Sequence, residues 1–185
     1  MSEYLALVAC GAPLAARVHD VAAAMKAQGW RVRVVATAAA TNWVDADAVE
    51  RVTGEAPLVE QRRPGEPKRF PTPGHVVVCP ATFNSVNKLA TGLMDNYAAG
   101  LVCEALASRT PLTLVPMVSD ALWGHPAWAG HLTTLQRTGV TFVDVRSGRA
   151  GEPEPVDAGT GDDLAAVFDP SWLAEVVGRP GSYPG

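Results

Sequence analysis

Short runs of mainly apolar residues alternate with helix-compatible segments along the first 145 residues, and this alternation is the strongest constraint on the fold. The apolar runs cover residues 4–10, 31–36, 76–79, 112–116 and 140–145. Strands that read as continuous apolar runs are typical of a parallel sheet that is covered by helices on both faces. The pattern therefore predicts an α/β fold, a doubly wound sheet of five parallel strands.

The segments between and after these strands predict the helices and loops. Helical spacing and capping residues favour helices at residues 14–28, 42–52 with Asp45 as the N-cap, 86–93, 97–107, 126–137 and 169–177. Five prolines among many charges predict an irregular loop over residues 54–73, and a Gly-, Pro- and acid-rich stretch predicts an excursion or flexible lid over residues 148–161. With 185 residues, 48% of them hydrophobic, we expect a single domain over residues 1–185 with its core at about 4–145.

Charge and cysteine content narrow the classes of partner. The formal net charge is −4 without a run of Lys or Arg, which gives no electrostatic footprint for nucleic acid or an anionic membrane. The apolar N-terminal stretch is too short for a membrane span and lacks the basic flank of a signal peptide, so we expect a cytoplasmic protein. Cys10, Cys79 and Cys103 are odd in number and have no CxxC spacing, which predicts buried thiols and no metal site. The expected partner is a small molecule or another protein.

The loops that follow the strands are the expected place for a ligand, because ligands of open α/β sheets bind outside the carboxyl ends of the strands. The loops after the first two strands contain small residues, Gly11 and Ala12 in one and Thr37 and Ala39 in the other, and each leads into a helix. Backbone N–H groups in such loops can hold a phosphate without a nearby Lys or Arg. Neither GxGxxG nor GxxxxGK[ST] is present, and ordinary packing turns explain these two loops equally well.

The third loop carries the most specific pattern, PATFNSVNKLATGLMDN over residues 80–96. It resembles the hallmark of the homo-oligomeric flavin-containing cysteine decarboxylases, which is PASANT followed by NKxAxGxxDN. The matching residues are Pro80, Ala81, Asn84, Asn87, Lys88, Ala90, Gly92, Asp95 and Asn96. Thr82 and Ser85 are conservative replacements, and Phe83 is the outlier.

This resemblance implies a flavodoxin-like Rossmann fold that binds FMN and assembles as a homotrimer or a dodecamer. Transferred by position, it implies a phosphate side and a flavin side. The residues implied are Gly11, Ala12, Thr37 and Ala39 for the phosphate, Thr82, Phe83, Asn84 and Ser85 for the flavin, and Met117 as a further neighbour. A peptide or small-molecule thiol is the implied substrate.

Two positions depart from the family pattern. Glu66 stands where the family has a histidine, and Ser119 stands where the asparagine of PxMNxxMW binds the substrate carboxylate, while His75 lies too close to the third strand to replace the histidine. The catalytic residues are therefore unknown from sequence, with His125, Ser119 and Asp120 as candidates.

Three functions are compatible with this pattern. The first is an FMN-dependent decarboxylase of a cysteine-type thiol with an altered pocket. The second is a non-catalytic FMN-binding partner or regulatory subunit, which the loss of both catalytic positions favours. Prenyl-FMN synthesis fits the motif less well.

Overall fold

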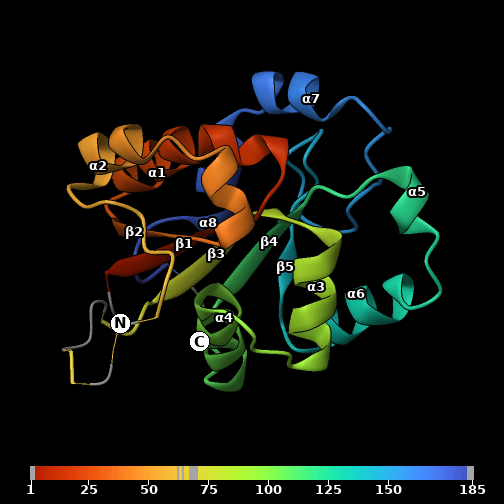
Figure 1. Ribbon diagram of the computed structural model, residues 1–185, viewed down its shortest axis with the longest axis horizontal. Coiled ribbons are helices and arrows are strands. Elements are labelled where there is room, and N and C mark those ends of the chain that lie inside the picture. Colours follow the sequence, from red (N-terminus) through yellow and green to blue (C-terminus); the bar gives the residue numbers. More distant parts are fainter. Residues whose placement is uncertain (1–2, 62, 64, 67–70, 183–185) are drawn as a thin grey trace.

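The computed structural model describes residues 3–61, 63, 65–66 and 71–182. Within these residues five parallel strands form one sheet in the order β2-β1-β3-β4-β5 (Figure 1). The strands are β1 (Tyr4–Ala9), β2 (Arg31–Ala36), β3 (His75–Ala81), β4 (Leu112–Pro116) and β5 (Thr141–Phe142). The chain runs outward from β1 to β2 and then returns to the other side of β1, so the strand order reverses between β1 and β3. This topology confirms the predicted doubly wound, flavodoxin-like fold.

Helices cover both faces of the sheet, as continuous apolar strands require (Figure 1). On one face the sheet packs against α1 (Val18–Ala27), α2 (Ala46–Thr53), α7 (Gly161–Val167) and α8 (Pro170–Val177). On the other face it packs against α3 (Phe83–Thr91), α4 (Tyr97–Ala107) and α6 (Trp128–Arg137). Three short elements connect these layers: the 3-10 helices η1 (Pro13–Arg17) and η2 (Ala38–Asn42), and α5 (Asp120–Trp123). The predicted N-cap of α2 is confirmed, since Asp45 Oδ1 accepts a hydrogen bond of 2.9 Å from Ala48 N.

The third strand is longer than the sequence pattern predicts. It begins at His75, which is fully buried and whose Nε2 lies 2.9 Å from Thr113 Oγ1 on β4. It ends at Ala81 instead of Cys79, because a register irregularity between Val78 and Ala81 lets the strand pass Pro80 and pair again with Pro116. His75 is thus the first residue of β3, and it does not belong to the loop after β3 that lines the cavity.

The segment predicted as an excursion or lid is attached to the sheet. Val156 is buried and forms a parallel bridge with Ser119, and Ala150 forms an antiparallel bridge with Val143. Asp144 is also buried and accepts hydrogen bonds from the backbone N–H groups of Arg146, Ser147 and Glu154. The helix α7, which the sequence analysis did not predict, follows directly.

Two further observations concern the predicted loop and the membrane. In the loop predicted over residues 54–73, Leu58 pairs with Val35, while residues 62, 64 and 67–70 lie outside the described part of the chain. None of the described helices is long and apolar enough to cross a membrane.

Candidate functional site

A cavity of about 600 Å³ opens at the carboxyl ends of β1 and β3, where the strand order reverses. Its volume falls within the range of roughly 300–1,000 Å³ that small-molecule sites occupy. Val8 and Val78 of the sheet line it, and the loops after β1, β2, β3 and β4 all contribute walls. Residues 96–102 at the start of α4 also line it, so five separate segments of the chain meet around one concave site.

The loops after β1 and β2 approach each other unusually closely. A Cβ atom added to Gly11 would lie 2.8 Å from Ala39 Cβ, so a larger residue at position 11 requires a shift of the second loop. Thr37 fixes that loop, since its backbone N donates to Ala9 O at 2.9 Å and its Oγ1 accepts from Ala40 N at 3.3 Å. The result is a tight turn of small residues that brings backbone close to whatever occupies the cavity.

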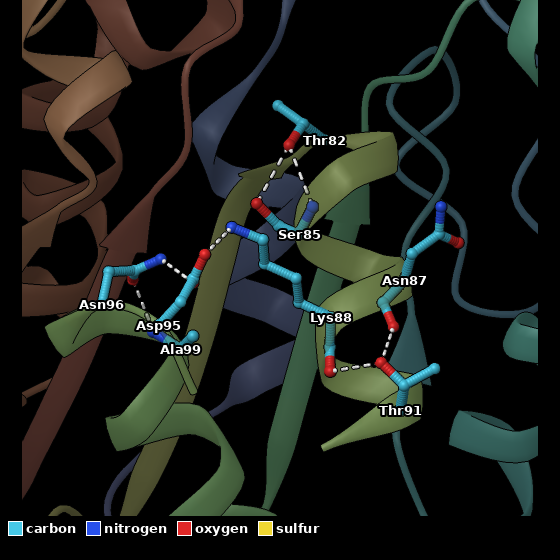
Figure 2. Close-up of polar contacts among 8 residues, drawn as sticks. All are labelled: Thr82, Ser85, Asn87, Lys88, Thr91, Asp95, Asn96 and Ala99. Atoms are coloured by element: carbon cyan, nitrogen blue, oxygen red, sulfur yellow. Dashed lines mark hydrogen bonds and ion pairs between the residues drawn. The ribbon is translucent and has the colours of Figure 1, made fainter. Parts of the chain in front are cut away.

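The first turn of α3 forms another wall. Thr82 is the N-cap: its Oγ1 accepts from Ser85 N at 3.3 Å and lies 2.9 Å from Ser85 Oγ (Figure 2). Asn84 lies in this turn and is exposed toward the cavity that it lines. Hydroxyl, amide and backbone N–H groups therefore converge on one end of the cavity, which suits a ligand with several hydrogen-bonding atoms.

Among the described residues that line this cavity, Lys88 is the only one with a charged side chain. Its Nζ lies 2.6 Å from Asp95 Oδ2, and Asp95 Oδ1 accepts from Asn96 Nδ2 at 2.9 Å (Figure 2). Asn96 also caps α4, because its Oδ1 accepts from Ala99 N at 2.9 Å. The hydrogen bond from Lys88 lowers the pKa of Asp95 below its ordinary value. This chain of contacts ties α3 to the start of α4.

Two residues of the same motif have roles that the sequence did not reveal. Asn87 points to the side of α3 opposite Lys88 (Figure 2). Its Oδ1 lies 2.8 Å from His131 Nδ1 on α6. Phe83, the outlier of the motif, stacks on Trp128 with ring centroids 5.2 Å apart. Both contacts attach α3 to α6.

Cys10 lies beside this wall and lines the cavity. Burial raises the pKa of its thiol, although a hydrogen bond with Ser85 and the charge of Lys88 act in the opposite direction. The thiol is therefore neutral near pH 7 and a poor nucleophile.

The sequence-predicted residues divide clearly between cavity and surroundings. The nine residues predicted for the cofactor all line the cavity: Gly11, Ala12, Thr37, Ala39, Thr82, Phe83, Asn84, Ser85 and Met117. Of the catalytic candidates, Ser119 lines it and Asp120 and His125 do not. Asp120 instead receives Ala121 N on its Oδ1, and His125 accepts from Ala127 N on its Nδ1.

Sequence reasoning missed several lining residues, of which Cys10, Lys88 and Trp43 are the most notable. The signal for Lys88 was present, because it stands three residues after Ser85 and so on the same face of α3. Trp43 follows η2, and no sequence pattern indicated that it would face the cavity.

Comparisons with known proteins agree with this architecture. The model of the family described as Flavoprotein matches residues 2–166. The Coenzyme A biosynthesis bifunctional protein CoaBC of Mycobacterium tuberculosis is 30% identical over 128 residues, which are 64% of this chain and 29% of that protein. The chain thus spans less than a third of the length of that relative.

Two solved structures share the fold. A mutant PPC decarboxylase complexed with pantothenoylaminoethenethiol has a TM-score of 0.68 at 21% identity, and the match covers 94% of this chain and 95% of that one. The FMN-dependent cysteine decarboxylase SpaF has a TM-score of 0.64 at 24% identity, with 89% of this chain and 97% of that one covered.

Proposed function

Because this chain belongs to the Flavoprotein family, we propose that its cavity between β1 and β3 binds FMN and that the bound flavin acts on a cysteine-type thiol substrate. The observation that carries the proposal is the cavity itself: about 600 Å³ at the reversal of strand order, with Gly11 against Ala39 at one side and the first turn of α3 at the other. The reversal point is where ligands of this sheet topology bind, FMN among them. SpaF, which shares the fold, is named as FMN-dependent.

The residues present suit the chemistry of FMN. The phosphate would fit beside Gly11, Ala39 and Thr37. The small side chains of Gly11 and Ala39 leave the backbone accessible to it, and Thr37 adds a hydroxyl group. The residues we assign to the flavin side are Thr82, Phe83, Asn84, Ser85 and Met117, with Ala12 beside the phosphate. When bound, FMN supplies two-electron oxidation.

The chain's own residues would position the substrate. Ser119 lines the cavity at the position where the resembling family has a carboxylate-binding asparagine, and its hydroxyl can donate one hydrogen bond to a carboxylate oxygen. Lys88 supplies a positive charge, and the buried Met117 and Val118 keep water from that side. We therefore assign to Ser119 the binding of the substrate carboxylate, with oxidative decarboxylation as the reaction.

A second function is supported by one specific observation. Among the described lining residues there is no histidine, so the cavity offers no imidazole to move a proton near neutral pH. This favours a non-catalytic FMN-binding partner or regulatory subunit. The homotrimer or dodecamer and the cytoplasmic location stay predictions.

FMN binding is tested by titrating the purified protein with FMN and following absorbance and fluorescence. We expect one FMN per chain. We expect Gly11→Val to weaken FMN binding by about tenfold or more, which corresponds to about 1.4 kcal/mol, because the added side chain would displace the loop that contains Ala39. Gly130→Val is the matched control, because Gly130 does not line the cavity and an added Cβ there meets no atom within 4 Å. A protein that refuses FMN, or a Gly11→Val variant with unchanged affinity, would contradict the proposed site.

The two functions are separated by anaerobic mixing of the FMN-loaded protein with peptides that end in cysteine. Bleaching of the flavin together with release of carbon dioxide indicates the decarboxylase, and Ser119→Ala should then reduce the rate with FMN content unchanged. A flavin that stays oxidised with every thiol, together with a stable complex with a second protein, indicates the non-catalytic subunit.

A further inference from the structure

Aromatic rings pack in a continuous series behind the α3 wall of the cavity. Phe83, the first residue of α3, lines the cavity and stacks on Trp128 of α6, with ring centroids 5.2 Å apart and 27° between the ring planes. Trp123, the last residue of α5, meets Trp128 edge-on at 5.2 Å and 61°. Both distances lie in the range of favourable aromatic pairs, about 4.5–7 Å. Phe83, Trp128 and Trp123 are called the aromatic series below.

The exposure of the rings changes along the aromatic series. Phe83 is half-buried at the cavity, Trp128 is 1% exposed, and Trp123 is half-buried again. Neither tryptophan lines the cavity. The aromatic series therefore begins at the cavity, passes through the protein interior and ends at a different part of the surface.

Trp128 carries a buried polar group that packing does not explain. Its Nε1–H donates to no acceptor among the described residues. Trp30, the other buried tryptophan, shows the usual arrangement, because its Nε1 donates to Gly178 O at 2.7 Å. The indole nitrogen can only donate, and a buried donor without an acceptor is unusual enough to indicate a role beyond packing, redox chemistry among them.

The chemistry of indole connects these observations. Tryptophan is among the side chains that lose an electron most readily, and a flavin excited by light is a strong one-electron oxidant. Oxidised indole is a cation, and it becomes a neutral radical only by giving its Nε1 proton to an acceptor. Trp128 has no such acceptor among the described residues, so its cation is neutralised by an electron from the adjoining ring, which is that of Trp123.

We propose that the aromatic series is a path for single electrons, along which light drives electrons from a thiol in solution to the bound flavin. This inference rests on the proposed function, because it needs FMN beside Phe83. Trp128 gives one electron to the excited flavin through the ring of Phe83, and Trp123 then restores Trp128. A thiol in solution gives one electron to Trp123 and releases its proton. A second such event joins the two sulfur atoms as a disulfide, so that two thiols supply two electrons and two protons.

The test illuminates the FMN-loaded protein with blue light, without oxygen and with dithiothreitol as the thiol, and follows the absorbance of oxidised flavin. The measured quantity is the bleaching rate in the light minus the rate in the dark. We expect the wild-type protein to bleach in the light. Trp123→Phe and Trp128→Phe should each slow this bleaching severalfold, at equal FMN content, because each substitution interrupts the aromatic series.

The fluorescence lifetime of the bound flavin distinguishes an electron path from a packing role. Trp128→Phe should lengthen the lifetime, because the first electron donor is lost. Trp123→Phe should leave the lifetime unchanged while still slowing the bleaching, because Trp128 remains in contact with Phe83 but is no longer restored. Equal lifetimes in the wild-type protein and Trp128→Phe would contradict the path.

Two further tryptophans serve as controls. Trp172→Phe is the matched control, since Trp172 contacts Phe168 at 5.8 Å between ring centroids and does not line the cavity. Trp43 lines the cavity without belonging to the aromatic series, so Trp43→Phe tests the competing electron donor. Both variants should bleach at the wild-type rate.

Four results would overturn this inference while leaving FMN binding intact. They are a wild-type protein that does not bleach in the light, unchanged bleaching in Trp123→Phe or in Trp128→Phe, loss of bleaching in Trp43→Phe, and an equal effect from Trp172→Phe. A protein that retains no FMN would overturn the proposed function and this inference together.

Discussion

The hydroxyl of Thr82 holds the first turn of α3 against the cavity. It accepts from Ser85 N at 3.3 Å and so caps α3, which begins at Phe83 beside the cavity. Thr82→Val keeps the shape and removes the acceptor, and we expect a loss of about 1 kcal/mol in the free energy of unfolding together with weaker FMN binding. Thr82→Ser should retain both properties. Urea unfolding and FMN titration measure the two effects, and an unchanged valine variant would show that the cap is dispensable.

At the scale of single residues, the sequence correctly predicted the cavity-lining residues that directly follow a strand. Thr37 and Met117 line the cavity because each follows a strand that the apolar pattern located correctly. Asp120 was a plausible candidate by position, but its backbone N donates to Val156 O and its Oδ1 accepts from the adjacent Ala121 N. That contact joins segments more than thirty residues apart, and local sequence patterns carry no information about it.

Among the elements, the segment between β5 and α7 depends on one buried carboxylate. Asp144 Oδ1 accepts from Ser147 N and Ser147 Oγ, both at 2.8 Å, and Oδ2 accepts from Glu154 N at 3.1 Å. Burial alone would raise the pKa of Asp144, but the hydrogen bonds donated to it hold the pKa below its ordinary value. The carboxylate therefore stabilises the folded state at neutral pH.

We expect Asp144→Asn to reduce the free energy of unfolding by about 1–3 kcal/mol at pH 7, since a charged acceptor is lost. Because the pKa of Asp144 is lowered in the folded state, its carboxylate stabilises the fold at pH values above the pKa of about 3.9 in the unfolded chain. This stabilisation is lost as the pH falls through the folded-state pKa. The gap between wild type and variant should thus be constant from pH 7 to about 4 and shrink below that. Asp163→Asn, at an exposed position of α7, serves as the control, and a gap that widens in acid would refute the role of Asp144.

The boundaries of elements were predictable only where local rules decide them. The predicted end of β3 was wrong by two residues, because Pro80 reads as a strand breaker while the register irregularity at Val78/Ala81 accommodates it. The helix α7 begins with Gly161 and two aspartates, which read as the end of an acidic loop. Its contact with Pro13 and the hydrogen bonds from Arg17 stabilise it instead.

For the whole molecule, we expect His75 to lower the free energy of unfolding in mildly acidic solution. It is fully buried at the start of β3, and burial lowers its pKa to about 4. Between that value and the unfolded pKa of about 6.5 the unfolded chain binds the extra proton, so stability falls as the pH falls through this window. We expect the free energy of unfolding to drop by about 2 kcal/mol from pH 7 to pH 5 on account of this residue.

The measurement is urea unfolding at several pH values between 7 and 4. His75→Gln should flatten the dependence, although it also lowers the stability at pH 7 because Gln fills the buried site less well. His125→Gln, at an exposed position, should retain the slope of the wild-type protein. A His75→Gln protein with an unchanged slope would assign the acid sensitivity to other groups.

The strand order of the whole sheet followed from the family resemblance, since the apolar pattern by itself predicts parallel strands without their order. The cavity between β1 and β3 could be predicted once that order was known, because reversal points bind ligands. The packing of Gly161 against Pro13 could not, because these two residues become neighbours only through the complete fold.

The hydrogen bonds from Arg17 to α7 also bear on the sequence of events in folding. They join positions 148 and 149 residues apart, which is among the longest loop closures that this chain can make. Contacts of such separation are entropically expensive and form late. During refolding we therefore expect amide protons in the sheet around the cavity between β1 and β3 to become protected from exchange before those of α7.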